Sequence, residues 1–174
     1  MKTLTDQLAQ YAAYHRDPRN ITTHFVGIPM IVLAVAVLLA RPVWDVAGMA
    51  VSPAWAVSIA AVLYYLKLEL RMGALMAVLM AINLWAAQWI ALQSTTAWLA
   101  SGVGLFVVGW AIQFLGHFYE GKKPAFVDDL VGLIIGPLFV VAEAVFAMGW
   151  RKDLLQAIEA RVGPVHLRDL TAVS

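Results

Sequence analysis

Residues 97–118 read AWLASGVGLFVVGWAIQFLGHF and contain no Asp, Glu, Lys or Arg. A helix of about 20 apolar residues is long enough to cross a bilayer. The segment ends in a dense polar run that continues from Tyr119 through Glu120, Gly121, Lys122 and Lys123. This stretch therefore predicts a membrane-spanning helix that delivers a histidine and a carboxylate to one membrane face.

The composition of the whole chain supports a membrane location. Of its 174 residues, 62% are hydrophobic and 13% are charged, against about 45–50% and about 25% in an average soluble domain. The net charge of +1 gives no reason to expect a nucleic-acid partner. The absence of cysteine excludes disulfides, thiolate-bound iron–sulfur clusters and thiolate-ligated haem. Histidine, aspartate and glutamate remain as the strong metal ligands.

Four more apolar stretches surround the first one, and together they predict an all-α fold. We expect a polytopic helical membrane bundle in which residues 1–174 form a single membrane domain. The fifth stretch contains Gly136-Pro137, which is expected to break or kink it. The bundle then has four full spans and a broken or kinked fifth segment, at about 24–40, 53–68, 73–92, 97–118 and 130–150.

Amphipathic helices are expected at both ends of the chain. Residues 3–15 place apolar side chains on one side, namely Leu4, Leu8, Tyr11 and Ala12. Asp17-Pro18 should end this helix, since the residue before proline avoids helical geometry. After Arg151 a basic segment carries an apolar stripe that we expect to lie along the membrane surface, made of Leu154, Leu155 and Ile158.

Polar side chains are expected to begin two of the membrane helices. Thr22 or Thr23 can cap the first span. Asp128 or Asp129 is placed to cap the fifth segment.

The distribution of basic residues predicts the orientation of the chain. Cytoplasmic loops of membrane proteins carry an excess of Lys and Arg. If the N-terminus is cytoplasmic, the first four spans place seven basic residues on the cytoplasmic side of the membrane and one, Arg41, on the opposite side. The seven are Lys2, Arg16, Arg19, Lys67, Arg71, Lys122 and Lys123. We therefore expect an integral protein, of a bacterial inner membrane, with its site facing the cytoplasm.

Two histidine-bearing polar clusters then meet at one membrane face. Four crossings separate His24 from His117, so His15, His24, His117 and Glu120 share the cytoplasmic side. His117 and Glu120 are three residues apart and point the same way on a helix. The break at residues 17–18 lets His15 fold back towards His24. Three imidazoles and a carboxylate match a nitrogen/oxygen site for Fe(II), Zn(II) or Mn(II).

The residues alone leave several functions open. The chain could be a metal-dependent membrane enzyme, for example a zinc-dependent lipid hydrolase, or a non-enzymatic small transporter or assembly protein. Glu143 lies inside an apolar segment, where a charge costs about 2.5–3.5 kcal/mol, so it should face a polar cavity or water. Lys122 and Lys123 can meet anionic headgroups or hold a substrate carboxylate.

Four motifs resemble the 2-hydroxy fatty acid dioxygenase family, whose fungal members act in phytosphingosine breakdown. The motifs are Tyr14-His15-Arg16-Asp17-Pro18-Arg19-Asn20, Thr23-His24-Phe25-Val26-Gly27-Ile28-Pro29, Gln113-Phe114-Leu115-Gly116-His117 and Glu120-Gly121-Lys122-Lys123-Pro124-Ala125. The resemblance extends through Asp128-Asp129-Leu130 and Gly136-Pro137-Leu138-Phe139 to about Glu143. His166 matches none of these motifs.

The resemblance implies an Fe(II)-dependent alpha-oxidation. A long-chain 2-hydroxy fatty acid and O2 would yield a fatty acid one carbon shorter. The protein would contact membrane lipids, and a homo-oligomer is possible. His15, His24 and His117 would be iron ligands, and Glu120 a fourth ligand or an orienting partner. The catalytic residues would be Glu120, Lys122 and Lys123. Asn20 and Gln113 would fix imidazole tautomers by hydrogen bonds.

Overall fold

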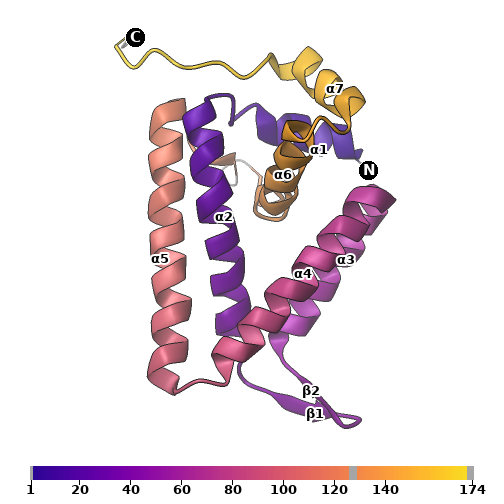
Figure 1. Ribbon diagram of the computed structural model, residues 1–174, viewed down its shortest axis with the longest axis vertical. Coiled ribbons are helices and arrows are strands. Elements are labelled where there is room, and N and C mark those ends of the chain that lie inside the picture. Colours follow the sequence, from indigo (N-terminus) through magenta and orange to yellow (C-terminus); the bar gives the residue numbers. More distant parts are fainter. Residues whose placement is uncertain (1, 126–128, 172–174) are drawn as a thin grey trace. The chain divides into compact units, whose positions relative to one another are not determined.

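The computed structural model describes residues 2–125 and 129–171, and these form seven helices and one two-stranded hairpin (Figure 1). The predicted helical architecture is confirmed, with the hairpin as an addition. The chain divides into two compact units. Residues Met1–Ile28 and Ala111–Ser174 form the first unit, and Pro29–Trp110 form the second. The first unit contains every candidate site residue.

Helix α1 (Leu4–Ala12) opens the first unit. The Thr3 side chain accepts the Asp6 N–H while the Asp6 side chain accepts the Thr3 N–H, a reciprocal arrangement that satisfies two donors at the helix start. The predicted apolar side is confirmed, since it is buried. A salt bridge of 2.7 Å between Asp6 and Arg161 ties α1 to the C-terminal part of the chain.

Helix α2 (Pro18–Leu39) begins earlier than the sequence indicated. The prediction of a cap at Thr22 or Thr23 is wrong. Pro18 occupies the first helical position, where its missing N–H costs nothing. Asp17 caps the helix instead, and its Oδ1 accepts the Arg19 N–H at 2.8 Å. Hydrogen bonds from the Arg19 side chain lower the pKa of Asp17 to about 2.

Helix α5 (Thr95–Glu120) packs closely against α2 within the first unit. A Cβ atom on Gly116 would meet Oγ1 of Thr23 and, at 2.5 Å, Oδ1 of Asn20. Only glycine therefore allows this approach. Gly121, with φ of +69°, ends the helix in left-handed geometry, and its N–H donates to the carbonyl of His117 at 2.9 Å.

A break or a kink was expected at Gly136-Pro137; helix α6 (Gly132–Ala147) continues through Pro137, so a break there is wrong and a kink stays a prediction. The chain breaks later, because the N–H groups of Gly149 and Trp150 bond back to the carbonyls of Phe146 and Val145. Gly149 has φ of +80°, as this helix-ending motif requires. Asp129 precedes α6 and its Oδ1 accepts the Val131 N–H at 3.0 Å; Asp128 lies outside the described residues.

Helix α7 (Lys152–Val162) follows at a bend of 116°. It packs against α1 (Figure 1). Leu154 and Ile158 of the predicted apolar stripe are buried. This part of the stripe therefore serves the packing of the first unit. An extended tail follows from Gly163, and its backbone contacts the segment at residues 16–17.

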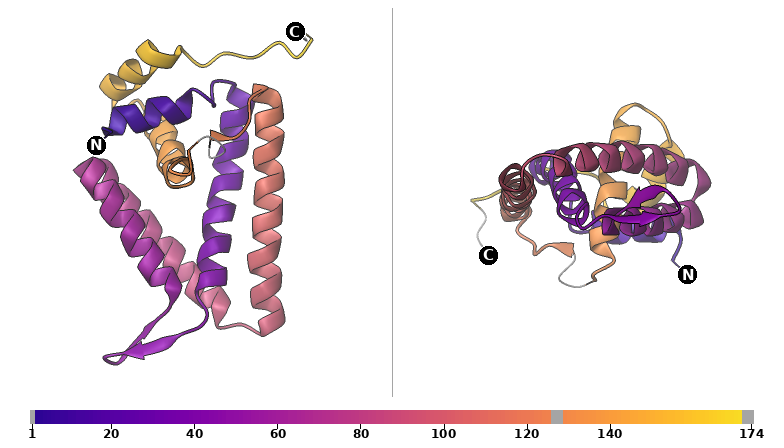
Figure 2. Two further views of the ribbon diagram at one scale, coloured as in Figure 1. Left: turned by 180° about the vertical axis from the view of Figure 1, so that it is seen from behind. Right: turned by 90° about the horizontal axis from the view of Figure 1, so that it is seen from below.

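The second unit contains the hairpin β1 (Trp44–Val46) and β2 (Met49–Val51), then α3 (Pro53–Leu68) and α4 (Leu70–Ala91). The hairpin was not expected. Ala47 and Gly48 both have positive φ, the geometry that a two-residue hairpin turn needs. Helices α3 and α4 lie side by side in both views of Figure 2. Their turn is short because Glu69 caps α4 through the N–H groups of Arg71 and Met72.

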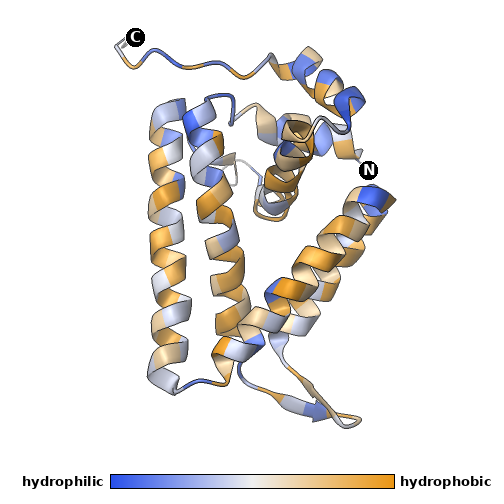
Figure 3. Ribbon diagram, in the orientation of Figure 1, coloured by the Kyte–Doolittle hydropathy of each residue, from blue (hydrophilic) through white to orange (hydrophobic). Residues whose placement is uncertain are grey.

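Three described helices are long and apolar enough to cross a membrane: α2, α4 and α5. The count rises to four if the bent pair α6 and α7 forms one span. Helix α3 is apolar but has only 16 residues. Four full spans plus a fifth are therefore not confirmed. Figure 3 shows apolar residues along these helices and hydrophilic ones gathered in α7 and the tail.

Candidate metal centre

Three histidines from three different segments meet in the first unit. His15 follows α1, His24 lies in α2, and His117 lies in the last turn of α5. All three are buried. The ring centroids are 4.3 Å apart for His15 and His24, 4.9 Å for His15 and His117, and 5.1 Å for His24 and His117. The fold therefore brings together the three histidines that the sequence selected.

Backbone carbonyls determine the tautomers of two of the rings. Nδ1 of His15 lies 2.7 Å from the Tyr11 carbonyl oxygen, and Nδ1 of His24 lies 2.9 Å from that of Asn20. A carbonyl only accepts, so each Nδ1 carries a proton and donates it. Each Nε2 then presents a lone pair, and these two atoms are 2.9 Å apart. Two facing lone pairs repel each other unless a cation or a proton lies between them.

The geometry of the cluster fits a metal ion with imidazole nitrogen ligands. One ligand atom from each histidine lies within 4.8 Å of the others. A metal held by imidazoles at about 2.0–2.1 Å brings neighbouring ligand nitrogens to about 3 Å from one another. Burial and the nearby His24 lower the pKa of His15 well below its usual value. The His15 ring is therefore neutral, as a metal ligand must be.

Glu120 lies next to the cluster but faces the backbone of the segment after α1. Its two carboxylate oxygens accept the Arg16 N–H, each at 3.0 Å, and Oε2 also accepts the Asp17 N–H at 2.8 Å. The Asn20 side-chain amide donates to Oε2 at 3.1 Å. These bonds occupy the carboxylate, so the geometry favours an orienting role for Glu120 over the role of fourth ligand.

A buried ion pair supports the same segment from the other side. Arg16 is 3% exposed and lies 3.5 Å from the carboxylate of Glu143. Glu143 was expected to face a polar cavity or water, and in the structure its partner is this buried guanidinium. The Arg16 guanidinium also donates to the carbonyls of Ala12, His15 and Gly163. Glu143 thus compensates a buried cation that holds the backbone of His15.

The extended tail completes this support. The His166 N–H donates to the Arg16 carbonyl at 2.9 Å, and the Arg168 N–H donates to Oδ2 of Asp17 at 2.9 Å. The Arg168 guanidinium lies over Gly121, where a Cβ atom would clash with it. The His166 imidazole itself is exposed and lies apart from the three clustered histidines.

Tyr11 was not expected at the site. Its ring stacks on His15 with centroids 4.2 Å apart and planes inclined by 2°. Phe139 packs against both rings, at 5.0 Å from Tyr11 and 5.4 Å from His15. Tyr11 is four residues before His15, one helical turn away, and this spacing is the signal that could have identified it.

The remaining predicted residues lie around the cluster. The Asn20 backbone carbonyl lies 2.9 Å from Nδ1 of His24, and the Asn20 side-chain amide donates to Oε2 of Glu120 at 3.1 Å. Gln113 is 3% exposed, and its Nε2 has no hydrogen-bond partner among the described residues. Lys122 and Lys123 are exposed, and Lys122 donates to the Ala13 carbonyl at 2.7 Å. The lysines therefore lie at the rim of the site.

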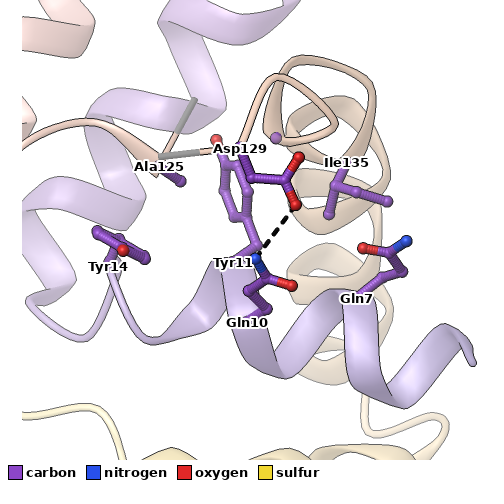
Figure 4. A pocket seen from close by; sticks show the side chains of 8 residues that line it. Gln7, Gln10, Tyr11, Tyr14, Ala125, Asp129 and Ile135 are labelled. Atoms are coloured by element: carbon purple, nitrogen blue, oxygen red, sulfur yellow. Dashed lines mark hydrogen bonds between the residues drawn. The ribbon is translucent and has the colours of Figure 1, made fainter. Parts of the chain in front are cut away.

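A small pocket opens beside Tyr11 (Figure 4). Gln10 and Asp129 face each other across it and are joined by a hydrogen bond of 3.3 Å. Its other walls are Gln7, Tyr11, Tyr14, Ala125, Gly132 and Ile135. The pocket borders the ring that stacks on His15, so a change there can reach the metal centre through Tyr11.

Comparisons with known proteins identify the family of the chain. A family model described as "2-hydroxy-palmitic acid dioxygenase Mpo1-like" matches residues 1–148. The chain is 30% identical over 160 residues to the "2-hydroxy-palmitic acid dioxygenase MPO1" of Saccharomyces cerevisiae, a match that covers 90% of this chain and 87% of the yeast protein. No solved structure matches. The chain therefore belongs to the Mpo1-like family of 2-hydroxy-palmitic acid dioxygenases.

Proposed function

We propose that this protein is an Fe(II)-dependent 2-hydroxy fatty acid dioxygenase that shortens its substrate by one carbon. In balance, a 2-hydroxy acid and O2 yield the acid one carbon shorter, CO2 and water. The yeast relative is named for 2-hydroxy-palmitic acid, so a long-chain 2-hydroxy acid is the proposed substrate. The observation that carries the proposal is the pair of Nε2 lone pairs of His15 and His24, 2.9 Å apart beside His117.

The chain's own residues prepare this centre. The carbonyls of Tyr11 and Asn20 hold protons on Nδ1, which keeps both Nε2 atoms available. Glu120 and Arg16 fix the backbone of residues 15–17. The stacked rings of Tyr11 and Phe139 shield His15 from water. Fe(II), when bound, would supply the redox chemistry that lets O2 react with the substrate.

The rim of the site fits an amphiphilic substrate at a membrane surface. Lys122 and Lys123 are exposed beside the cluster and are proposed to meet the substrate carboxylate, while the acyl chain lies among the apolar helices. Residues 1–28 and 111–174 belong to one unit, as a shared membrane face requires. We propose a bacterial inner-membrane location with this unit cytoplasmic, and reporter fusions at the N-terminus and near Lys122 should report the same side.

The decisive experiment measures metal and oxygen together. The protein is purified in detergent without oxygen, loaded with Fe(II), and supplied with 2-hydroxypalmitic acid and O2. We expect about one iron per chain, O2 consumption, and the 15-carbon acid as product. His117→Ala should lose both iron and turnover, whereas the matched variant His166→Ala should keep both.

Other outcomes would identify other functions. Stoichiometric zinc that does not exchange for iron, with activity that needs no O2, would indicate a lipid hydrolase. A protein that binds no metal and tolerates His117→Ala would indicate a transporter or assembly protein. Either outcome overturns the dioxygenase assignment.

A further inference from the structure

Gln113 is a buried polar side chain that the histidine centre does not use. It lies on α5 one turn before His117 and two turns before Glu120, so the three residues share one side of the helix. The side chain is 3% exposed. Its Nε2 atom is buried as well, and this atom has no hydrogen-bond partner among the described residues.

Several neighbouring polar groups of the centre have hydrogen-bond partners, and the Gln113 donor differs from them in this respect. His15 and His24 each donate Nδ1 to a backbone carbonyl, so neither needs Gln113 to fix its tautomer. The carboxylate of Glu120 is occupied by backbone and Asn20 donors. A buried amide donor without a partner costs about 1–3 kcal/mol. A residue that carries such a cost beside a metal centre indicates a partner that arrives from outside.

One more open group lies close to the same centre. Oδ1 of Asn20 is buried and has no hydrogen-bond partner in the described part of the chain. The first unit therefore contains an unsatisfied buried donor on Gln113 and an unsatisfied buried acceptor on Asn20. An acyl chain satisfies none of them. A 2-hydroxycarboxylate head group has oxygen atoms that accept and a hydroxyl that donates, which matches this set.

We propose that Gln113 is a substrate-binding residue whose side-chain N–H donates to an oxygen of the 2-hydroxycarboxylate head group at the histidine cluster. The inference rests on the proposed function, since it takes its ligand from the proposed substrate. It differs from an imidazole-orienting role because the partner is the substrate. Gln113 then contributes to substrate affinity and leaves metal affinity unchanged.

The test is a binding measurement on protein loaded with Co(II), which does not turn over, with 2-hydroxypalmitic acid titrated against the visible spectrum of the metal. Gln113→Met keeps the length of the side chain and removes the donor. We expect a loss of about 10- to 100-fold in affinity, the range for a hydrogen bond to a charged acceptor. Gln113→Glu places a carboxylate against the substrate carboxylate and should lose more. Gln88→Leu, a glutamine change in α4 of the second unit, is the matched control and should bind as the wild type.

Two further readouts separate this role from a structural one. Co(II) affinity should be the same in Gln113→Met and in the wild type. The melting temperature of substrate-free Gln113→Met should equal or exceed that of the wild type, because an unsatisfied buried donor has been removed. A glutamine that orients a ligand or supports packing would instead lower metal affinity or melting temperature when it is replaced.

The outcomes also distinguish the two proposals. If wild-type protein binds no 2-hydroxy acid, the proposed function fails and this inference fails with it. If wild-type protein binds the acid and both Gln113 variants bind it equally well, this inference alone is wrong. Loss of Co(II) by Gln113→Met would likewise overturn it and assign Gln113 to the metal.

Discussion

Glu120 accepts the backbone N–H of Asp17 at 2.8 Å, across 103 residues of sequence. This bond joins the end of α5, which carries His117, to the start of α2, the helix that carries His24. The carboxylate also accepts the Arg16 N–H next to His15. One side chain thus sets the positions of all three histidine-bearing segments without being placed as a ligand.

Substitution of Glu120 should therefore weaken the centre without removing it. Glu120→Gln keeps the shape but replaces one acceptor oxygen by a donor group that faces the Asp17 N–H or the Asn20 amide. We expect about one metal ion per chain at saturation, with affinity lower by about 10- to 100-fold. Metal titration followed by elemental analysis measures both quantities. Glu69→Gln, which alters a capping carboxylate of α4 in the other unit, is the control. Complete loss of metal, as expected for His117→Ala, would make Glu120 a ligand.

Gly116 should tolerate no side chain. A Cβ atom there would overlap Thr23 and Asn20, and Asn20 orients His24. Gly116→Ala should destabilise the protein by about 1–3 kcal/mol, as overpacking usually does, and should weaken metal binding. Gly104 lies on the same helix, and a Cβ atom added to it would have no neighbour within 4 Å, so Gly104→Ala should be harmless. Thermal unfolding in detergent compares the two variants; equal melting temperatures would contradict the close packing of α5 on α2.

The tail should act through its backbone and not through the His166 imidazole. The His166 N–H donates to the Arg16 carbonyl at 2.9 Å, while the imidazole is exposed. His166→Pro removes the N–H and should lower metal affinity several-fold, because one net hydrogen bond contributes about 1 kcal/mol. His166→Ala keeps the N–H and should match the wild type. The measurement is the metal affinity of the two variants. If His166→Pro binds metal as tightly as His166→Ala, the backbone of the tail does not support the site.

Acid should loosen the contact between α1 and α7. Hydrogen bonds from the Thr3 backbone and the Arg161 side chain lower the pKa of Asp6 below its usual value. A carboxyl whose pKa is lower in the folded state contributes stability above its unfolded pKa of about 3.9 and loses it as the pH falls further. Melting temperature should therefore drop below about pH 4 more steeply in the wild type than in Asp6→Asn, which lacks the charge at every pH. Parallel pH profiles would show that the Asp6–Arg161 pair adds nothing.

The sequence by itself determined the helical class, the apolar segments and the identity of the three histidines. The helical class and the apolar segments follow from runs of apolar residues, and the histidines stand out because they lie in polar clusters at the ends of such runs. The four crossings expected between His24 and His117 are not confirmed. The amphipathic side of α1 was also predictable, since Leu4, Leu8 and Tyr11 recur at helical spacing. Glycine follows the ends of three helices, as Gly121 after α5, Gly149 after α6 and Gly163 after α7, but the break at Gly149 was not predicted.

Only the tertiary structure decided how the histidines are held. The ion pair of Arg16 with Glu143 and the hydrogen bond from the His166 N–H to the Arg16 carbonyl join residues that are far apart in the sequence, so no local spacing predicts them. The role of Glu120 depends on which donors reach its carboxylate, and these come from more than 100 residues away along the chain. A carboxylate three residues from a histidine could either bind the metal or hold the neighbouring backbone by hydrogen bonds. The fold favours the supporting role, because the N–H groups of Arg16 and Asp17 and the Asn20 side-chain amide already donate to this carboxylate.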